Sequence, residues 1–214
     1  MEIVKEVSEL EGDSAYYYRR MRDIEWSKQN YQNALEFQLK IYDLDTISNI
    51  DYYSLANAYA NAGQFENSLK YWKKDLERYN ESDYIPIWNS HRIGYAYWMN
   101  GYIKEGEEWF KKQIEYDQQA IQLDRSRAIA HLSYYDLAAV YAFLGEKEKA
   151  LDNFRTFSST EYVIEYFISL VHNDPLLDNI RDEPEFQQIV FNLEAKYKAE
   201  HERVRQWLEE NDML

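Results

Sequence analysis

One stretch, residues 52–76, constrains the fold more than any other part of the chain, because approximate copies of it recur along the sequence. Apolar and small residues at helical spacing mark its first helix: Tyr52, Leu55, Ala56 and Tyr59. Gly63 then ends that helix, since glycine adopts a left-handed backbone at little cost. A second helix carries apolar and small residues on one face: Phe65, Ser68, Leu69 and Trp72. The stretch therefore predicts a helical hairpin that cannot bury all of its apolar surface alone.

The turn of this hairpin recurs at three further positions. Gly63 aligns with Gly101 and Gly145 downstream and with Gln29 upstream, and the interval from Gln29 to Gly63 equals one bare repeat of about 34 residues. A unit that leaves apolar surface open is stabilised by stacking on copies of itself. The aromatic content of 17% and the small number of prolines, three, also suit long helices packed by large rings. The sequence therefore predicts an all-α repeat protein.

The residues around these turns resemble the tetratricopeptide repeat (TPR) family, whose units follow the spacing W-x2-L-G-x2-Y and then A-x3-F. Three copies keep this spacing: Tyr52, Leu55, Ala56, Tyr59, Ser68 and Trp72; Ser90, Ile93, Gly94, Tyr97, Gly106 and Phe110; Tyr134, Leu137, Ala138, Tyr141, Ala150 and Phe154. The copy before them is degraded, as expected of a terminal repeat: Tyr18, Met21, Arg22, Glu25, Ala34 and Gln38. The closing proline of the family is absent. The resemblance implies a right-handed α-solenoid of about four TPR-like helical hairpins with a C-terminal capping helix.

The predicted domain organisation has three parts: an N-terminal helix or linker at residues 1–12, a repeat array at 13–158 and a helical cap at 159–214. The expected hairpins cover residues 14–43, 48–79, 84–124 and 126–158. The second helix of the third hairpin should be overlong, since its apolar pattern continues to Asp124 without a breaker. In the cap, residues 158–160 are expected to begin a helix that ends near His172. Each later proline should break helical structure before a final helix begins at about 184 and runs to about 209.

Charge and composition exclude several classes of partner. Subtracting 24 basic from 39 acidic side chains leaves a net charge of −15, which repels nucleic-acid phosphates and anionic membrane surfaces. Alternatively, this negative charge only keeps a long helical surface soluble and has no bearing on a partner. The chain has no cysteine, its first residues show no secretory signal, and Glu165 interrupts its longest apolar patch. We therefore expect a cytoplasmic protein with no nucleic-acid or membrane partner.

Catalysis is not expected. The four histidines are expected on different helices or helix ends: His91, His131, His172 and His201. The sequence contains no HExxH pair, phosphate-binding glycine loop or nucleophile elbow. Abundant carboxylates on helices usually form solvated faces. We predict neither an enzyme nor a metal or cofactor site.

The family resemblance implies a concave groove lined by the first helices of successive hairpins. The positions carried over are Arg19, Asp23, Trp26, Tyr53, Asn57, Asn61, Trp88, His91, Tyr95, Trp98, Tyr135 and Phe143. Rings beside amides form the kind of surface that anchors an extended peptide or a helix, so a protein-interaction or scaffold module is expected. The alternative is that the long third hairpin or the C-terminal helix already fills the groove.

The C-terminal part supports two further interpretations. The segment DPLLDNIRDEPEF resembles the closing segment of repeat arrays in bacterial multidomain signalling and regulatory proteins, which implies such a context. The last helix carries a sparse apolar stripe: Tyr197, Val204, Trp207 and Leu208. The stripe either docks on the helix at 160–172 or pairs with a second copy. Self-association as a homodimer within a larger protein is therefore the alternative function.

Overall fold

The computed structural model describes residues 14–44, 52–79, 89–129, 131–161 and 163–213. The N-terminal helix or linker predicted at residues 1–12 and the predicted groove residue Trp88 lie outside these ranges. The chain forms two compact units, Met1–Lys112 and Gln113–Leu214. The predicted three-part organisation remains a prediction.

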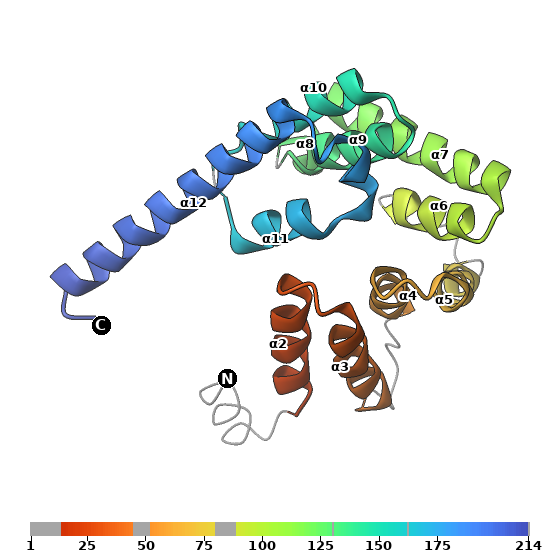
Figure 1. Cartoon of the computed structure of the whole chain (residues 1–214), viewed down its shortest axis with the longest axis horizontal. Helices are drawn as coiled ribbons and strands as arrows, with labels where there is room; N and C mark the ends of the chain where they lie inside the picture. The colour runs from red at the N-terminus through yellow and green to blue at the C-terminus, as the bar shows by residue number, and fades with distance from the viewer. Residues whose placement is uncertain (1–13, 45–51, 80–88, 130, 162, 214) are drawn as a thin grey trace. The chain divides into compact units, whose positions relative to one another are not determined.

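The first unit is built from consecutive helices that lie side by side (Figure 1). Its elements are α2 (Ser14–Ser27), α3 (Tyr31–Leu44), α4 (Tyr52–Asn61), α5 (Phe65–Tyr79), α6 (Ser90–Met99) and the first part of α7 (Ile103–Gln122). The helix α2 packs on α3 and α4 packs on α5, while α3–α4 and α5–α6 contacts join successive pairs. This pairing confirms the predicted all-α, TPR-like architecture.

The predicted turn residues all adopt the left-handed backbone conformation. The φ angles are 62° at Gln29, 72° at Gly63, 84° at Gly101 and 80° at Gly145. Gln29 carries a Cβ and is therefore less suited to this conformation than the glycines. Its presence at the equivalent turn confirms that the degraded first copy is a true hairpin.

The core of the first unit lies between its helix pairs. Buried residues of α4, α5 and α6 form one cluster: Ala56, Leu69, Trp72, Ile93 and Ala96. The helices α6 and α7 approach each other closely, since a Cβ added to Gly94 would lie 3.0 Å from the carbonyl oxygen of Gly106. Glycine at both positions lets the two backbones meet. The small residues of the repeat spacing are therefore explained by helix packing.

Within the described residues, the second unit contains the last part of α7 and six further helical elements that follow it. They are α8 (Ser126–Ile129), α9 (Leu132–Phe143), α10 (Lys147–Ser158), α11 (Glu165–Asn173), the 3-10 helix η2 (Pro175–Ile180) and α12 (Pro184–Glu210). The pair α9–α10 forms the hairpin, η2 packs on both helices, and α12 contacts α10 and α11. The expected helix before the Gly145 turn is divided, because His131 has a φ of 60° just before α9.

Two expectations about helix limits have different outcomes. The prediction of an overlong α7 is confirmed, since it has 20 residues against 15 for α5. The prediction that residues 158–160 begin the next helix is wrong. The hydroxyl groups of Ser158 and Ser159 donate to the carbonyl oxygens of Arg155 and Thr156, both at 2.7 Å, and so close α10. The helix α11 begins only at Glu165.

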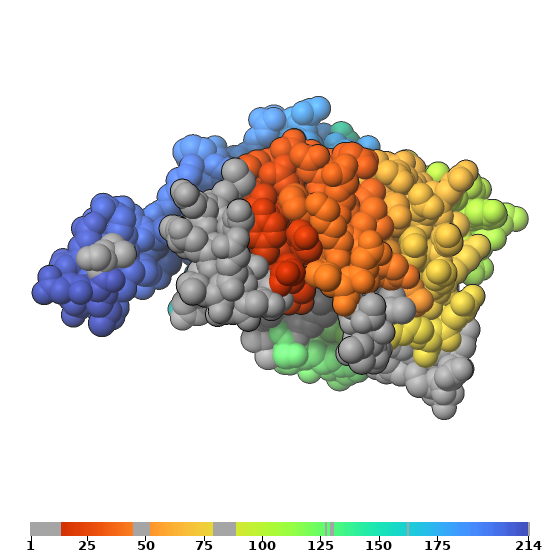
Figure 2. All heavy atoms as spheres, turned by 90° about the horizontal axis from the view of Figure 1, so that it is seen from below, coloured from red at the N-terminus to blue at the C-terminus, as the bar shows by residue number. Residues whose placement is uncertain are grey.

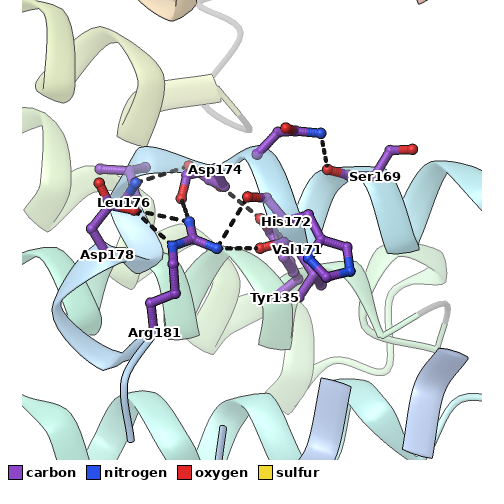
Figure 3. A network of polar contacts seen from close by, with 9 residues as sticks. Tyr135, Ser169, Val171, His172, Asp174, Leu176, Asp178 and Arg181 are labelled. Carbon is purple, nitrogen blue, oxygen red and sulfur yellow. Dashed lines mark hydrogen bonds and ion pairs between the residues drawn. The ribbon is translucent and has the colours of Figure 1, made fainter. Parts of the chain in front are cut away.

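A polar network joins η2 to its neighbours (Figure 3). Asp174 accepts a hydrogen bond from the Leu176 amide at 3.0 Å through one oxygen and from the Tyr135 hydroxyl at 2.7 Å through the other. Arg181 donates to the carbonyl oxygens of Val171, His172 and Asp174 at 3.1, 3.1 and 2.9 Å. The prolines behave as expected, since Pro175 and Pro184 each occupy the first turn of a new helix.

Candidate functional site

The predicted groove residues differ in how much surface they offer. Arg19, Asp23 and Tyr53 are exposed. The half-buried residues are Trp26, Asn57, Asn61, Trp98 and Phe143. The buried residues are His91, Tyr95 and Tyr135. The set is therefore not one uniformly exposed surface.

Two of the three buried residues, Tyr95 and Tyr135, have packing roles. The ring of Tyr95 meets that of Phe65 edge-on, with centroids 5.9 Å apart. In the second unit, Tyr135 is 1% exposed, and its hydroxyl group is bonded to Asp174 of the segment that packs on α9. At this position the C-terminal segment covers the first helix of the hairpin. A partner cannot contact these side chains in the described conformation.

The residues that keep accessible area in the first two hairpins define a first-helix surface: Arg19, Asp23, Trp26, Tyr53, Asn57 and Asn61. They come from α2 and α4. The ring of Tyr53 is 39% exposed, and its inner side meets the buried Trp72 ring at a centroid distance of 5.5 Å. The Asn57 amide donates to the Tyr53 carbonyl oxygen at 3.0 Å. The aromatic ring is therefore held in place while part of it faces solvent.

An amide-rich depression of ≈ 330 Å³ adjoins Asn61 at the turn between α2 and α3. Its lining is Gln29, Asn30, Tyr31, Gln32, Asn33, Asn61 and Ala62. Figure 2 shows the neighbouring helices, with α2 in red beside α3 in orange on one face of this unit. Side-chain amides both donate and accept hydrogen bonds, so they match the groups of an extended peptide backbone.

The carboxylate of Glu25 organises this turn. It accepts hydrogen bonds from the amides of Asn30 at 2.9 Å and Asn33 at 3.2 Å, and it pairs with Lys28 at 3.3 Å. The hydrogen bonds from Asn30 and Asn33 are the main reason that the pKa of Glu25 lies below its usual value, and Lys28 adds a smaller effect in the same direction. The carboxylate therefore remains ionised and fixes the turn amides.

Successive turns of the first unit are also connected by amides, which the repeat spacing did not predict. Gln64 donates to Gln32 at 3.4 Å, and Asn100 donates to the Phe65 carbonyl oxygen at 2.9 Å. A second depression, of ≈ 580 Å³, lies at the later turn and is lined by Gly63, Gln64, Phe65, Glu66, Asn67, Met99 and Asn100. The signal for these contacts was present in the sequence as Asn and Gln residues beside the turns at Gln29, Gly63 and Gly101.

The surroundings of the histidines differ from one another. The His131 ring nitrogen lies 2.8 Å from the Thr156 carbonyl oxygen, and His172 pairs with Glu194 at 2.7 Å. Within the described ranges, no group of three or more His, Cys, Asp or Glu residues has an arrangement that could hold a metal ion.

No helix in the same ranges is long and apolar enough to cross a membrane.

Comparison with known protein families identifies one part of the chain. Residues 90–125, which contain α6 and α7, match the family model of the tetratricopeptide repeat. This match includes the Gly94–Gly106 contact described above. No curated protein matches the chain.

Proposed function

From the tetratricopeptide repeat at residues 90–125, we propose that this chain is a non-catalytic scaffold module that binds a peptide or helix of a partner protein on the first-helix surface. Repeats of this family generally mediate protein–protein interaction. The observation that carries the proposal is the partly exposed ring of Tyr53, held against Trp72 beside the amide of Asn57. The bacterial signalling context and the cytoplasmic location remain predictions from the sequence.

The chemistry of the first-helix surface favours a peptide over a small molecule. A held ring provides apolar contact area with little further loss of side-chain entropy on binding. Asn57 and Asn61 add donors and acceptors for a backbone, and the exposed charges of Arg19 and Asp23 have opposite signs, which would orient a bound segment. These groups extend along two helices, as the length of a peptide requires.

Changing this surface is expected to remove peptide binding while the fold remains intact. Peptides would first be selected on the wild-type chain from a random display library. Their affinity should then fall at least about tenfold for Tyr53→Ala and for Asn57→Ala/Asn61→Ala, because truncating central contacts commonly costs more than 1 kcal/mol. Fluorescence anisotropy would measure the affinities, and circular dichroism would verify the helix content.

The control is Tyr166→Ala in the second unit, since Tyr166 is 54% exposed and lies outside the first-helix surface. Equal affinities for the wild-type chain and the two surface variants would contradict the proposal. So would an equal loss in the Tyr166 variant, which would mean that binding does not depend on this surface.

A second candidate function, self-association through α12, is favoured by one observation. The first half of α12 is anchored by buried Phe186, Ile189 and Leu193, whereas Val204 and Trp207 are 41% and 51% exposed. Within the second unit, the C-terminal half of α12 extends beyond α10 and α11 (Figure 1). The expectation that the whole stripe docks on the helix at 160–172 is therefore wrong for these two residues.

If the exposed stripe pairs two copies, the molar mass should rise with protein concentration and Val204→Glu/Trp207→Glu should prevent the rise. A charge in an apolar helix seam is unfavourable, because it loses hydration without gaining a partner. Sedimentation equilibrium would measure the mass. Phe191→Glu is the matched control, since Phe191 is 65% exposed on the same helix but lies outside the stripe. A monomeric mass at all concentrations would eliminate this candidate.

A further inference from the structure

Three lysines of α5 gather over tyrosine rings in the first unit. The ammonium group of Lys73 lies 5.7 Å from the ring centroids of both Tyr97 and Tyr102. Lys74 lies 5.0 Å from the Tyr71 centroid, and Lys70 lies 5.6 Å from the same ring. These distances are within the range in which a ring attracts a cation.

No ion pair joins these three lysines to a carboxylate in the described parts of the chain, and they lie together on one helix. Elsewhere, Lys28 pairs with Glu25, Lys147 with Glu183 and Lys149 with Glu146. Three clustered cations without such partners contrast with a net charge of −15 for the whole chain. Their charge is therefore available to an anionic group from outside.

The lysines line a depression of ≈ 600 Å³ that is large enough for several side chains. Its lining is Glu66, Leu69, Lys70, Lys73, Lys74, Glu77, Asn100 and Tyr102. Tyr102 is 48% exposed and adds an apolar face and a hydroxyl group. We name Lys70, Lys73, Lys74 and Tyr102 the lysine–tyrosine patch.

Two glutamates limit the patch along α5. Glu66 lies about one turn before Lys70, and Glu77 lies about one turn after Lys73 and Lys74. A continuous phosphate backbone that followed the helix would meet one of these carboxylates. A short segment with two or three carboxylates fits between them.

We propose that the lysine–tyrosine patch binds a short acidic segment of a partner protein. The carboxylates of the segment pair with the three lysines, and its carbon chain packs on the exposed ring of Tyr102. This site is separate from the first-helix surface, because it lies on α5 and on the turn before α7, whereas that surface lies on α2 and α4. It therefore provides a second, charge-selective contact.

The test uses acetylated hexaglutamate as the probe and hexaglutamine as the neutral comparison, with the isotope-labelled full chain at low ionic strength. Binding of hexaglutamate should shift the amide resonances of residues 70–74 and Tyr102. Lys70→Gln/Lys73→Gln/Lys74→Gln should weaken this binding at least about tenfold, since each exposed pair contributes up to about 1 kcal/mol. The single variant Lys73→Gln repeats the test with a smaller change to the surface.

The matched control is Lys28→Gln/Lys40→Gln/Lys104→Gln, which changes the net charge equally at exposed positions outside the depression. Lys40 also lies over aromatic rings, those of Tyr18 and Phe37. The proposal requires less than about threefold weakening in this control. It is overturned by an equal loss in both triple variants, by hexaglutamate binding no better than hexaglutamine, or by a hexauridylate RNA that binds at least as tightly.

Discussion

Replacing Trp72 with alanine is expected to lower the free energy of unfolding of the first unit by about 3–5 kcal/mol, the usual cost of truncating a fully buried tryptophan. Trp72 is 0% exposed and packs in the cluster that joins α4, α5 and α6. Its removal leaves a cavity between two hairpins and also removes the support of the Tyr53 ring. Urea unfolding followed by circular dichroism measures the loss, and hydrogen exchange should show it in residues 52–79.

Trp207→Ala provides the control for this result, because Trp207 is 51% exposed on α12. An exposed substitution usually changes the unfolding free energy by less than about 0.5 kcal/mol. If Trp72→Ala and Trp207→Ala had the same small effect, Trp72 would not be a core residue of the first unit. Loss of exchange protection throughout the second unit alone would also contradict the assignment.

In the second unit, Asp174→Ala should lower the free energy of unfolding by about 2–4 kcal/mol. The variant loses the cap on η2 and the bond from the buried Tyr135 hydroxyl group, and bonds to a charged group contribute about 1.5–3 kcal/mol. The η2 segment is then no longer fixed on α9. Hydrogen exchange in residues 163–180 and a decrease in thermal stability would report this loss (Figure 3).

Asp178→Ala is the matched control on the same 3-10 helix. Its carboxylate is exposed and accepts from Arg181 at 2.9 Å, so its removal should cost less than about 1 kcal/mol. Tyr135→Phe retains the ring and removes only the hydroxyl group, and should therefore cost less than Asp174→Ala. An Asp178 variant as unstable as the Asp174 variant would show that the buried bond is not the main contribution.

The two proposed surfaces of the first unit can be separated experimentally, because they occupy different helices. Tyr53 belongs to α4, whereas Lys73 belongs to α5. A partner that uses both should lose part of its affinity when either surface is changed and most of it when both are changed. A partner that uses only one should be insensitive to changes in the other. This comparison distinguishes failure of the peptide-binding proposal from failure of the acidic-segment proposal.

Local features of the sequence determined the helices, their turns and the positions at which small residues allow two helices to pack closely. The spacing of apolar residues and the turn position were enough to predict helix pairs, because both depend on residues close together in the chain. Even Gln29, which lacks the chemical signal of glycine, could be placed by its alignment with Gly63. Gly94 and Gly106 occupy small-residue positions of the same spacing, and their small size permits the close approach of α6 and α7.

Tertiary packing decided which side chains of a helix remain accessible, since burial depends on segments that are distant in sequence. Tyr135 occupies a groove position by spacing, yet a carboxylate 39 residues later binds its hydroxyl group and the C-terminal segment covers it. Ser158 and Ser159 could have begun a helix, but bonds to the preceding turn close α10 instead. The sequence by itself therefore determined a helical repeat protein with its turns, and only the three-dimensional packing determined its accessible surfaces, because a helix period does not specify what lies against each face.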